Sequence, residues 1–121
     1  MDKAQAWHSF LSGFGWTAYD ENTVPDEAGD EYITYESAEA NLGKQVLLSA
    51  SLWKRSTSWK AITQKAHEIA QSLGYGGTTV PFEGGAIFIT QGNPFAQRLQ
   101  GEDDATRRIL LNFSVEFLSA Y

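Results

Sequence analysis

Cysteine is absent from this sequence of 121 residues, and histidine and basic residues are scarce. Without cysteine the chain forms no disulfide and no thiolate metal site, so it carries no sign of either redox compartment. The 9 Lys and Arg residues are outnumbered by 15 Asp and Glu residues, which gives a formal net charge of −6. Because proteins hold nucleic acid through clustered positive charge at the phosphates, we expect no sequence-specific nucleic-acid binding.

Long apolar runs are missing as well. No stretch reaches the ~18 consecutive apolar residues of a transmembrane helix, and the start, MDKAQAWHSF, has no signal-peptide pattern. We therefore expect no membrane partner and a protein that is made and assembled in the cytoplasm. Internal repeats and low-complexity tracts are also absent, so residues 1–121 are expected to form a single domain with one core.

The clearest pattern lies between Gln45 and Gly74, where a strand is predicted to lead directly into an amphipathic helix. Alternate positions of the strand are expected on the core face of a sheet, namely Val46, Leu48, Ala50 and Leu52. Apolar side chains then recur at helical spacing and line one stripe, namely Trp59, Ile62, Ala66, Ile69, Ala70 and Leu73. N-cap candidates are Ser56, Thr57 and Ser58, and Gly74 suits the position beyond the helix end.

Weaker patterns predict the remaining elements. A first helix is expected over Lys3 to Phe14, and loops are expected at Asp20 to Asp30 and Gly92 to Ala105. Further strands are predicted at Glu31 to Ser37, around Thr78 to Val80, at Ala86 to Gln91 and at Arg107 to Leu118. The resulting expectation is an α+β fold, an antiparallel sheet of about four strands with a long central helix and an N-terminal helix packed on it.

Each candidate catalytic or binding motif is better explained by a structural role. His8 and His67 lie on separate predicted helices without metal ligands at a suitable spacing, and Glu102 to Asp104 lack the spacing of a calcium loop. The glycine-rich run from Gly74 to Thr79 follows a helix, whereas a phosphate-binding loop precedes one. We therefore predict no catalytic, cofactor-binding or metal-binding residue and no enzyme activity, although a site assembled only by the fold stays an alternative.

Surplus apolar residues are more informative. Leu47 and Trp53 project from the strand face opposite the core set, and Leu110 does the same on the last strand. One interpretation is that the N-terminal helix covers this second face. The other is that these residues form a subunit interface, because large apolar side chains on mixed faces carry much of the binding energy between proteins.

Three segments resemble a known family: WKRSTSWKAITQKAHEIAQSLGYGG, AIFITQGNPFAQRL and DDATRRILLNFSVEF. They look like the tail-completion proteins of siphophages and prophages, of the tail terminator or minor capsid type. The resemblance runs from about Tyr32 to Leu118. It rests on the order of the elements, on Pro94 and Phe95 in the long loop, and on Arg107 and Arg108 at the entry to the last strand.

The resemblance implies a structural protein of the virion, located in the tail or at the head-tail joint. Such a protein acts without chemistry, as a homo-oligomeric ring, commonly a hexamer, that docks on the tail tube and on the head-tail connector. Both predicted loops would then reach neighbouring subunits, and an acidic lumen would let DNA pass. The expected interface residues are Leu47, Trp53, Pro94, Phe95, Arg98, Arg107, Arg108 and Leu110. The alternative is a small, non-enzymatic bacterial adaptor or binding domain that dimerises through the sheet.

Overall fold

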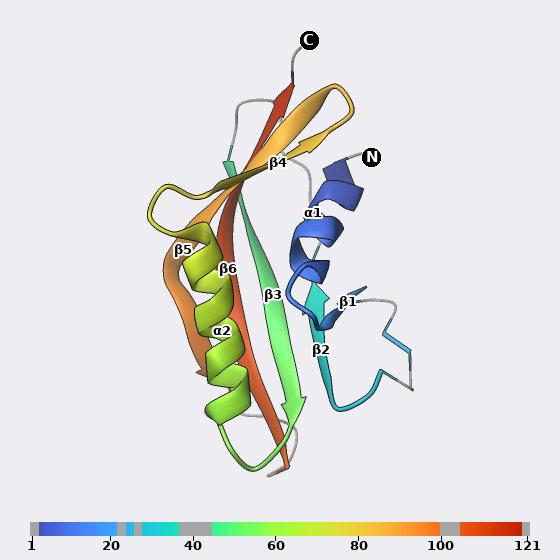
Figure 1. Cartoon of the computed structure of the whole chain (residues 1–121), viewed down its shortest axis with the longest axis vertical. Coiled ribbons are helices and arrows are strands. Elements are labelled where there is room, and N and C mark those ends of the chain that lie inside the picture. Colours follow the sequence, from blue (N-terminus) through green and yellow to red (C-terminus); the bar gives the residue numbers. More distant parts are fainter. Residues whose placement is uncertain (1–2, 22–23, 26–27, 37–44, 100–104, 120–121) are drawn as a thin grey trace.

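The computed structural model describes residues 3–21, 24–25, 28–36, 45–99 and 105–119. Within these residues, each of two helices is followed by three strands (Figure 1). The elements are α1 (Lys3–Ser12), β1 (Thr17–Asp20), β2 (Glu31–Tyr35), β3 (Gln45–Arg55), α2 (Lys60–Leu73), β4 (Thr78–Phe82), β5 (Gly85–Leu99) and β6 (Thr106–Ser119).

The six strands form a single sheet in the order β1-β2-β3-β6-β5-β4. Strand β1 runs parallel to β2, and every other neighbouring pair is antiparallel. The prediction of an antiparallel sheet of about four strands with a long central helix was therefore wrong. The sheet is mixed and six-stranded, and its two helices are short, with 10 and 14 residues.

The two central strands follow the alternation that the sequence predicted. Strands β3 and β6 pair without a break from Gln45 opposite Glu116 to Arg55 opposite Thr106. Their inward residues are buried, namely Leu48, Ala50 and Leu52 on β3 and Ile109, Leu111, Phe113, Val115 and Phe117 on β6. Only Val46 of the predicted core set is less than fully buried, although it still packs against the core.

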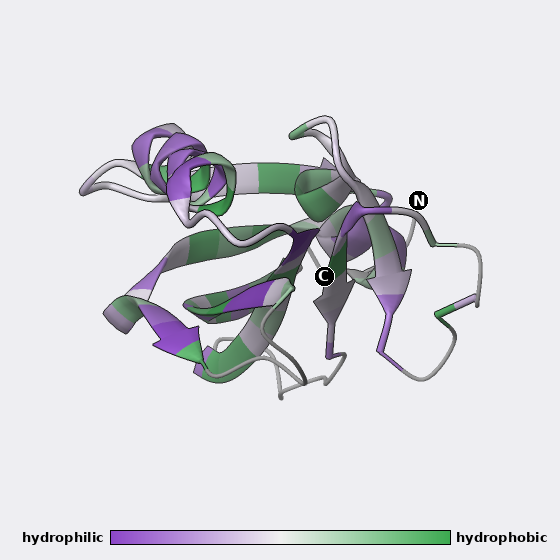
Figure 2. Ribbon diagram, turned by 90° about the horizontal axis from the view of Figure 1, so that it is seen from below, coloured by the Kyte–Doolittle hydropathy of each residue, from purple (hydrophilic) through white to green (hydrophobic). Residues whose placement is uncertain are grey.

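Both helices lie on the same side of the sheet (Figures 1 and 2). Helix α2 buries Ile62, Ala66, Ile69 and Leu73 of the stripe predicted for it, whereas Trp59 and Ala70 are half-buried. It ends at Gly74, which has a φ of 58°. Its start differs from the prediction, because Trp59 is the N-cap residue and makes no side-chain capping bond. Ser58 instead accepts a hydrogen bond from the Lys60 amide through its Oγ at 3.1 Å.

Helix α1 contacts both β1 and β4, which are the two edge strands of the sheet. A flat sheet keeps its edges far apart, so these contacts require the sheet to curl around α1 into a half-barrel. The Trp7 and Phe10 rings of α1 pack edge-on against Phe113 of β6 at centroid distances of 5.2 and 6.1 Å. Helix α1 therefore packs on the inner face, and neither described helix covers the opposite face. The interpretation that the N-terminal helix covers this second face was wrong.

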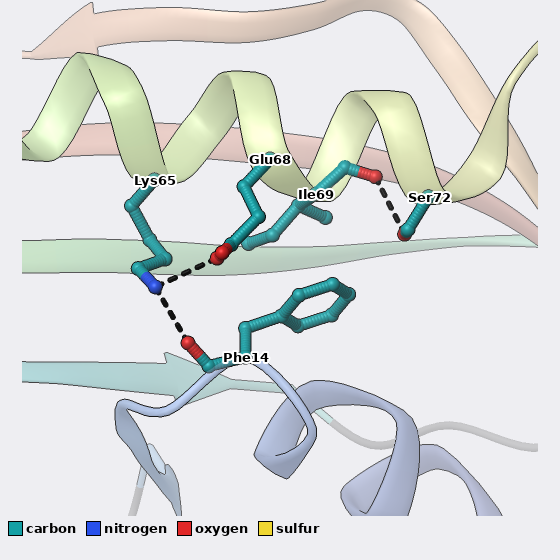
Figure 3. Close-up of polar contacts among 5 residues, drawn as sticks. All are labelled: Phe14, Lys65, Glu68, Ile69 and Ser72. Atoms are coloured by element: carbon teal, nitrogen blue, oxygen red, sulfur yellow. Dashed lines mark hydrogen bonds and ion pairs between the residues drawn. The ribbon is translucent and has the colours of Figure 1, made fainter.

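Lys65 joins the two helices (Figure 3). From α2, its Nζ donates to the backbone carbonyl of Phe14, just beyond α1, at 2.5 Å and to Glu68 Oε2 at 2.7 Å. The same ammonium group lies 5.6 Å from the centre of the Trp16 ring. Because the side chain bridges the end of α1 to the middle of α2, it fixes the distance between the helices over the sheet.

Strand β5 is longer than the sequence indicated. The predicted strand ended at Gln91, and Gly92 to Ala105 was expected to be a loop, but residues Gly92–Leu99 continue the strand. A register shift between Gln91 and Ala96 takes up the extra residues as a bulge. Phe95 in the bulge packs edge-on against Phe113 at 5.3 Å. The rest of that predicted loop, apart from Ala105, lies outside the described residues.

The sequence also missed β1, which is only four residues long. Its pairing with β2 gives it strand geometry, and so short a segment has too little alternation to be recognised alone. By contrast, β2 lies within the strand predicted at Glu31 to Ser37, and it pairs antiparallel with β3 from Glu31 opposite Lys54 to Tyr35 opposite Ala50. The connection between them, residues 37–44, lies outside the described residues.

Candidate functional site

The face of the sheet opposite the helices, called here the outer face, is the candidate interaction surface. Every second residue of each strand projects from it, and no described helix covers it (Figure 2). Leu47 of β3 is 73 % exposed there and Leu118 of β6 is 40 % exposed. Exposure of large apolar side chains to water is unfavourable, so a partner surface that covers this face would be stabilised by their burial.

At the other end of β3, four planar groups stand in a row across the outer face. Tyr19 of β1 meets Tyr32 of β2 at 6.1 Å in an edge-to-face contact, and Tyr32 stacks on Trp53 of β3 at 6.1 Å. The Arg108 guanidinium of β6 completes the row, 4.6 Å from the centre of the Trp53 ring. Register produces the row, because Tyr32, Trp53 and Arg108 are directly opposite one another on adjacent strands.

Hydrogen bonds hold this row in place. The Trp53 indole donates from Nε1 to Thr34 Oγ1 at 2.9 Å, and Arg108 donates from Nε to Ser51 Oγ at 3.1 Å. Ser51 is the buried polar residue of β3, with 4 % of its surface exposed. Since both flat side chains are fixed in position before any partner arrives, binding through them costs little conformational entropy.

A shallow depression of about 380 Å³ lies over this row. Tyr32, Trp53 and Arg108 are among its lining residues, and the segment that contains Glu21 and Asp30 borders it. Lys54 and Arg55 add further charge at the same border. Charges of both signs around an aromatic floor are typical of a protein contact rather than of a site for a single small anion.

A second cluster of cations lies on the inner side, at the start of α2. The Trp59 ring is flanked by the guanidinium groups of Arg98 at 4.7 Å and Arg107 at 5.3 Å. Arg107 also donates from Nη2 to the Thr57 carbonyl at 2.9 Å. These contacts attach the first turn of α2 to the paired strands β5 and β6, which is a structural role.

His8 takes part in the clearest chain of hydrogen-bonding side chains. Its Nδ1 lies 3.0 Å from the Tyr35 hydroxyl, and its Nε2 lies 3.2 Å from Ser12 Oγ. Burial, and to a smaller extent the charge of Asp20, raises the pKa of Tyr35. The chain links α1 to β2. Across the described ranges, no three side chains of the His, Cys, Asp and Glu types come together to hold a metal ion.

The structure separates the predicted interface residues into two groups. The first group shares the outer face and consists of Leu47, Trp53, Arg108 and Leu110. The sequence had predicted this placement for Leu47, Trp53 and Leu110. Of the other four, Arg98, Arg107 and Phe95 face the inner side, and Pro94 lies in the bulge of β5. Pro94 is exposed, Phe95 packs against the core, and Arg98 and Arg107 both contact Trp59.

Sequence reasoning missed the two tyrosines of the planar row. It predicted the strand at Glu31 to Ser37 that contains Tyr32, but only the register of β2 against β3 brings Tyr32 to Trp53. Tyr19 was expected to lead into a loop, and it reaches the row only because β1 pairs with β2. The available signal was the aromatic content of both segments.

Neither described helix is long and apolar enough to cross a membrane. No protein-family model, curated protein or solved structure matches this chain.

Proposed function

We propose that this chain is a structural assembly protein of the phage tail-completion type, which acts as a homo-oligomeric ring at the end of the tail or at the head-tail joint. The observation that carries the proposal is the uncovered outer face, with Leu47 73 % exposed at one end and the planar row at the other. In this proposal the surface acts by complementarity alone, so no residue needs to perform chemistry.

The energetics favour an occupied outer face. Covering the exposed Leu47 side chain stabilises a contact by roughly 1.5–3 kcal/mol. Trp and Arg residues fixed in position, such as Trp53 and Arg108, are the types that contribute most to protein interfaces. A partner that spans the outer face from Leu47 to Trp53 therefore gains apolar burial at one end and an ordered aromatic contact at the other.

Deletion of the coding gene from its phage or prophage genome tests the function. We expect electron micrographs of the induced lysate to show unjoined heads and tails, or tails with unfinished ends. Supplying the wild-type chain from a plasmid should restore complete particles, whereas Leu47→Thr should restore far fewer. Gln64→Ala, on the exposed side of α2, is the matched control and should restore them fully.

The mass of the oligomer in solution distinguishes this function from that of a small adaptor. Native mass spectrometry of the purified chain, alone and with tail tubes, is expected to show one closed oligomer larger than a dimer. A dimer that Leu47→Thr dissociates, together with normal particles after gene deletion, would instead establish a small binding domain that dimerises through its sheet.

A further inference from the structure

Two strand segments at opposite edges of the sheet have no described strand on their outer side, and they lie at the same position along the strand direction. Strand β5 has 15 residues, yet β4 covers only Gly85–Ile89 of it, and no described strand covers the outer side of Ala96–Leu99. At the opposite end of the strand order, β1 pairs with β2 on one side and with no described strand on the other. In a β-ladder, alternate residues direct their N–H and C=O groups to each side, and among the described residues no strand pairs with the outward side of either edge.

The register of the sheet shows how closely these edges correspond. Following the pairs across β2, β3 and β6, Thr17 is at the level of Leu99, and Asp20 is at the level of Ala96. The open segment of β5 and the whole of β1 therefore each span four residues at one height. Their side chains also match, since Tyr19 and Gln97 both project from the outer face.

Strand direction is compatible with pairing. Strand β1 is parallel to β2, and the successive pairs β2-β3, β3-β6 and β6-β5 are each antiparallel, so β1 runs opposite to β5. Rotating a copy about an axis along the strands keeps this relation. We infer that β1 of one copy pairs antiparallel with Ala96–Leu99 of the next copy, so that the sheet continues from subunit to subunit. This inference rests on the ring proposed above.

Charge favours pairing of unlike edges over like edges. The β5 segment carries Arg98, and β1 ends at Asp20 and is followed by Glu21. Pairing β5 with a second β5 would bring two Arg98 side chains together, whereas pairing it with β1 brings opposite charges together. The bulge and Pro94, which has no N–H group, confine the open part of β5 to the residues beyond them.

Engineered cysteines test this contact, because the chain has none of its own. Tyr19→Cys combined with Gln97→Cys places the thiols on directly opposed residues of the inferred pair, within the ~4.4–6.8 Å Cα separation of disulfides. Under mild oxidation the double variant should give a ladder of covalent multimers. Each single variant should give none, and an equal mixture of the two should stop at dimers. Thr17→Cys with Leu99→Cys is a second pair that keeps the edge-to-face contact of Tyr19 with Tyr32.

Gln97→Cys with Gln64→Cys is the matched control, because Gln64 lies on the exposed side of α2, and it should give no ladder. Dimers from a single variant, an equal ladder from the control, or no ladder from either designed pair would overturn the inference. Native mass spectrometry of the unmodified chain distinguishes the two proposals. Rings without designed cross-links refute the edge contact alone, and cross-linked chains without a closed ring refute the proposed function alone.

Discussion

The guanidinium of Arg108 lies 4.6 Å from the centre of the Trp53 ring, and the two residues are directly opposite each other on β6 and β3. The same guanidinium donates to the buried hydroxyl of Ser51. One side chain thus satisfies a buried polar group and covers an aromatic face. Arg108 consequently stabilises the subunit as well as shaping its outer face.

Arg108→Ala should lower the free energy of unfolding by about 1–2 kcal/mol, because it removes the stacking and the bond to Ser51 together. Arg108→Lys keeps the charge but loses the planar group and its Nε, so it should recover little of that loss. Urea denaturation measures both. Arg55→Ala, exposed at the end of β3, is the control and should change stability by at most about 0.5 kcal/mol. Full recovery by lysine would show that charge alone matters.

Phe113→Ala should be among the most damaging substitutions. Its ring is fully buried and packs against Trp7, Phe10 and Phe95, so truncation leaves a cavity at the junction of α1, β5 and β6. We expect a loss of about 3–5 kcal/mol, measured by thermal and urea unfolding. Tyr75→Ala removes an aromatic side chain that is fully exposed and should be nearly neutral. Similar losses for the two variants would contradict the placement of the core.

Tyr35 makes stability sensitive to alkaline pH. Burial, and then the charge of Asp20, raises its pKa above the ordinary value of 10.0. The folded protein therefore holds this proton more tightly than the unfolded chain does. This stabilisation is complete below the unfolded pKa and is lost as the pH rises through the folded pKa.

Tyr35→Phe should therefore make the fall in unfolding free energy above pH 10.0 shallower. The measurement is a series of urea titrations at increasing pH, with Tyr75→Phe as the control. A wild-type and a Tyr35→Phe protein with the same alkaline slope would show that this hydroxyl ionises alike in both states.

Gly77 and Gly76 form a matched pair in the turn between α2 and β4. Gly77 has a φ of 77°, and a Cβ there would lie 2.5 Å from the Ile89 carbonyl oxygen, whereas a Cβ on Gly76 would meet nothing within 4 Å. Gly77→Ala should destabilise the protein by about 1–3 kcal/mol. Gly76→Ala should be neutral or stabilising by up to about 1 kcal/mol. Urea unfolding that ranks them in the reverse order would contradict the geometry of this turn.

Predictions from the sequence were correct where local periodicity was long. The alternation in β3 and β6 and the apolar stripe of α2 each extend over enough residues to define a face. They failed at β5, where Gly92 and Pro94 indicated a loop. A bulge accommodates both residues, and packing of Phe95 on Phe113 compensates for the broken ladder.

The candidate site shows the same division. Leu47, Trp53 and Leu110 were assigned to the face opposite the core from alternation alone, and the structure places them there. The contact of Trp53 with Tyr32 and Arg108 depends on the register of three strands that are distant in the sequence. Periodicity gives no information on register between strands, so the planar row was not predictable.

The sequence by itself determined the inward and outward faces of the central strands and the buried stripe of α2, because these follow from the spacing of side chains along one segment. Tertiary structure alone decided the strand order, the strand character of β1 and of Gly92–Leu99, and the placement of both helices on one face. These features depend on pairing and packing between distant segments, where hydrogen bonds and buried area override local preference.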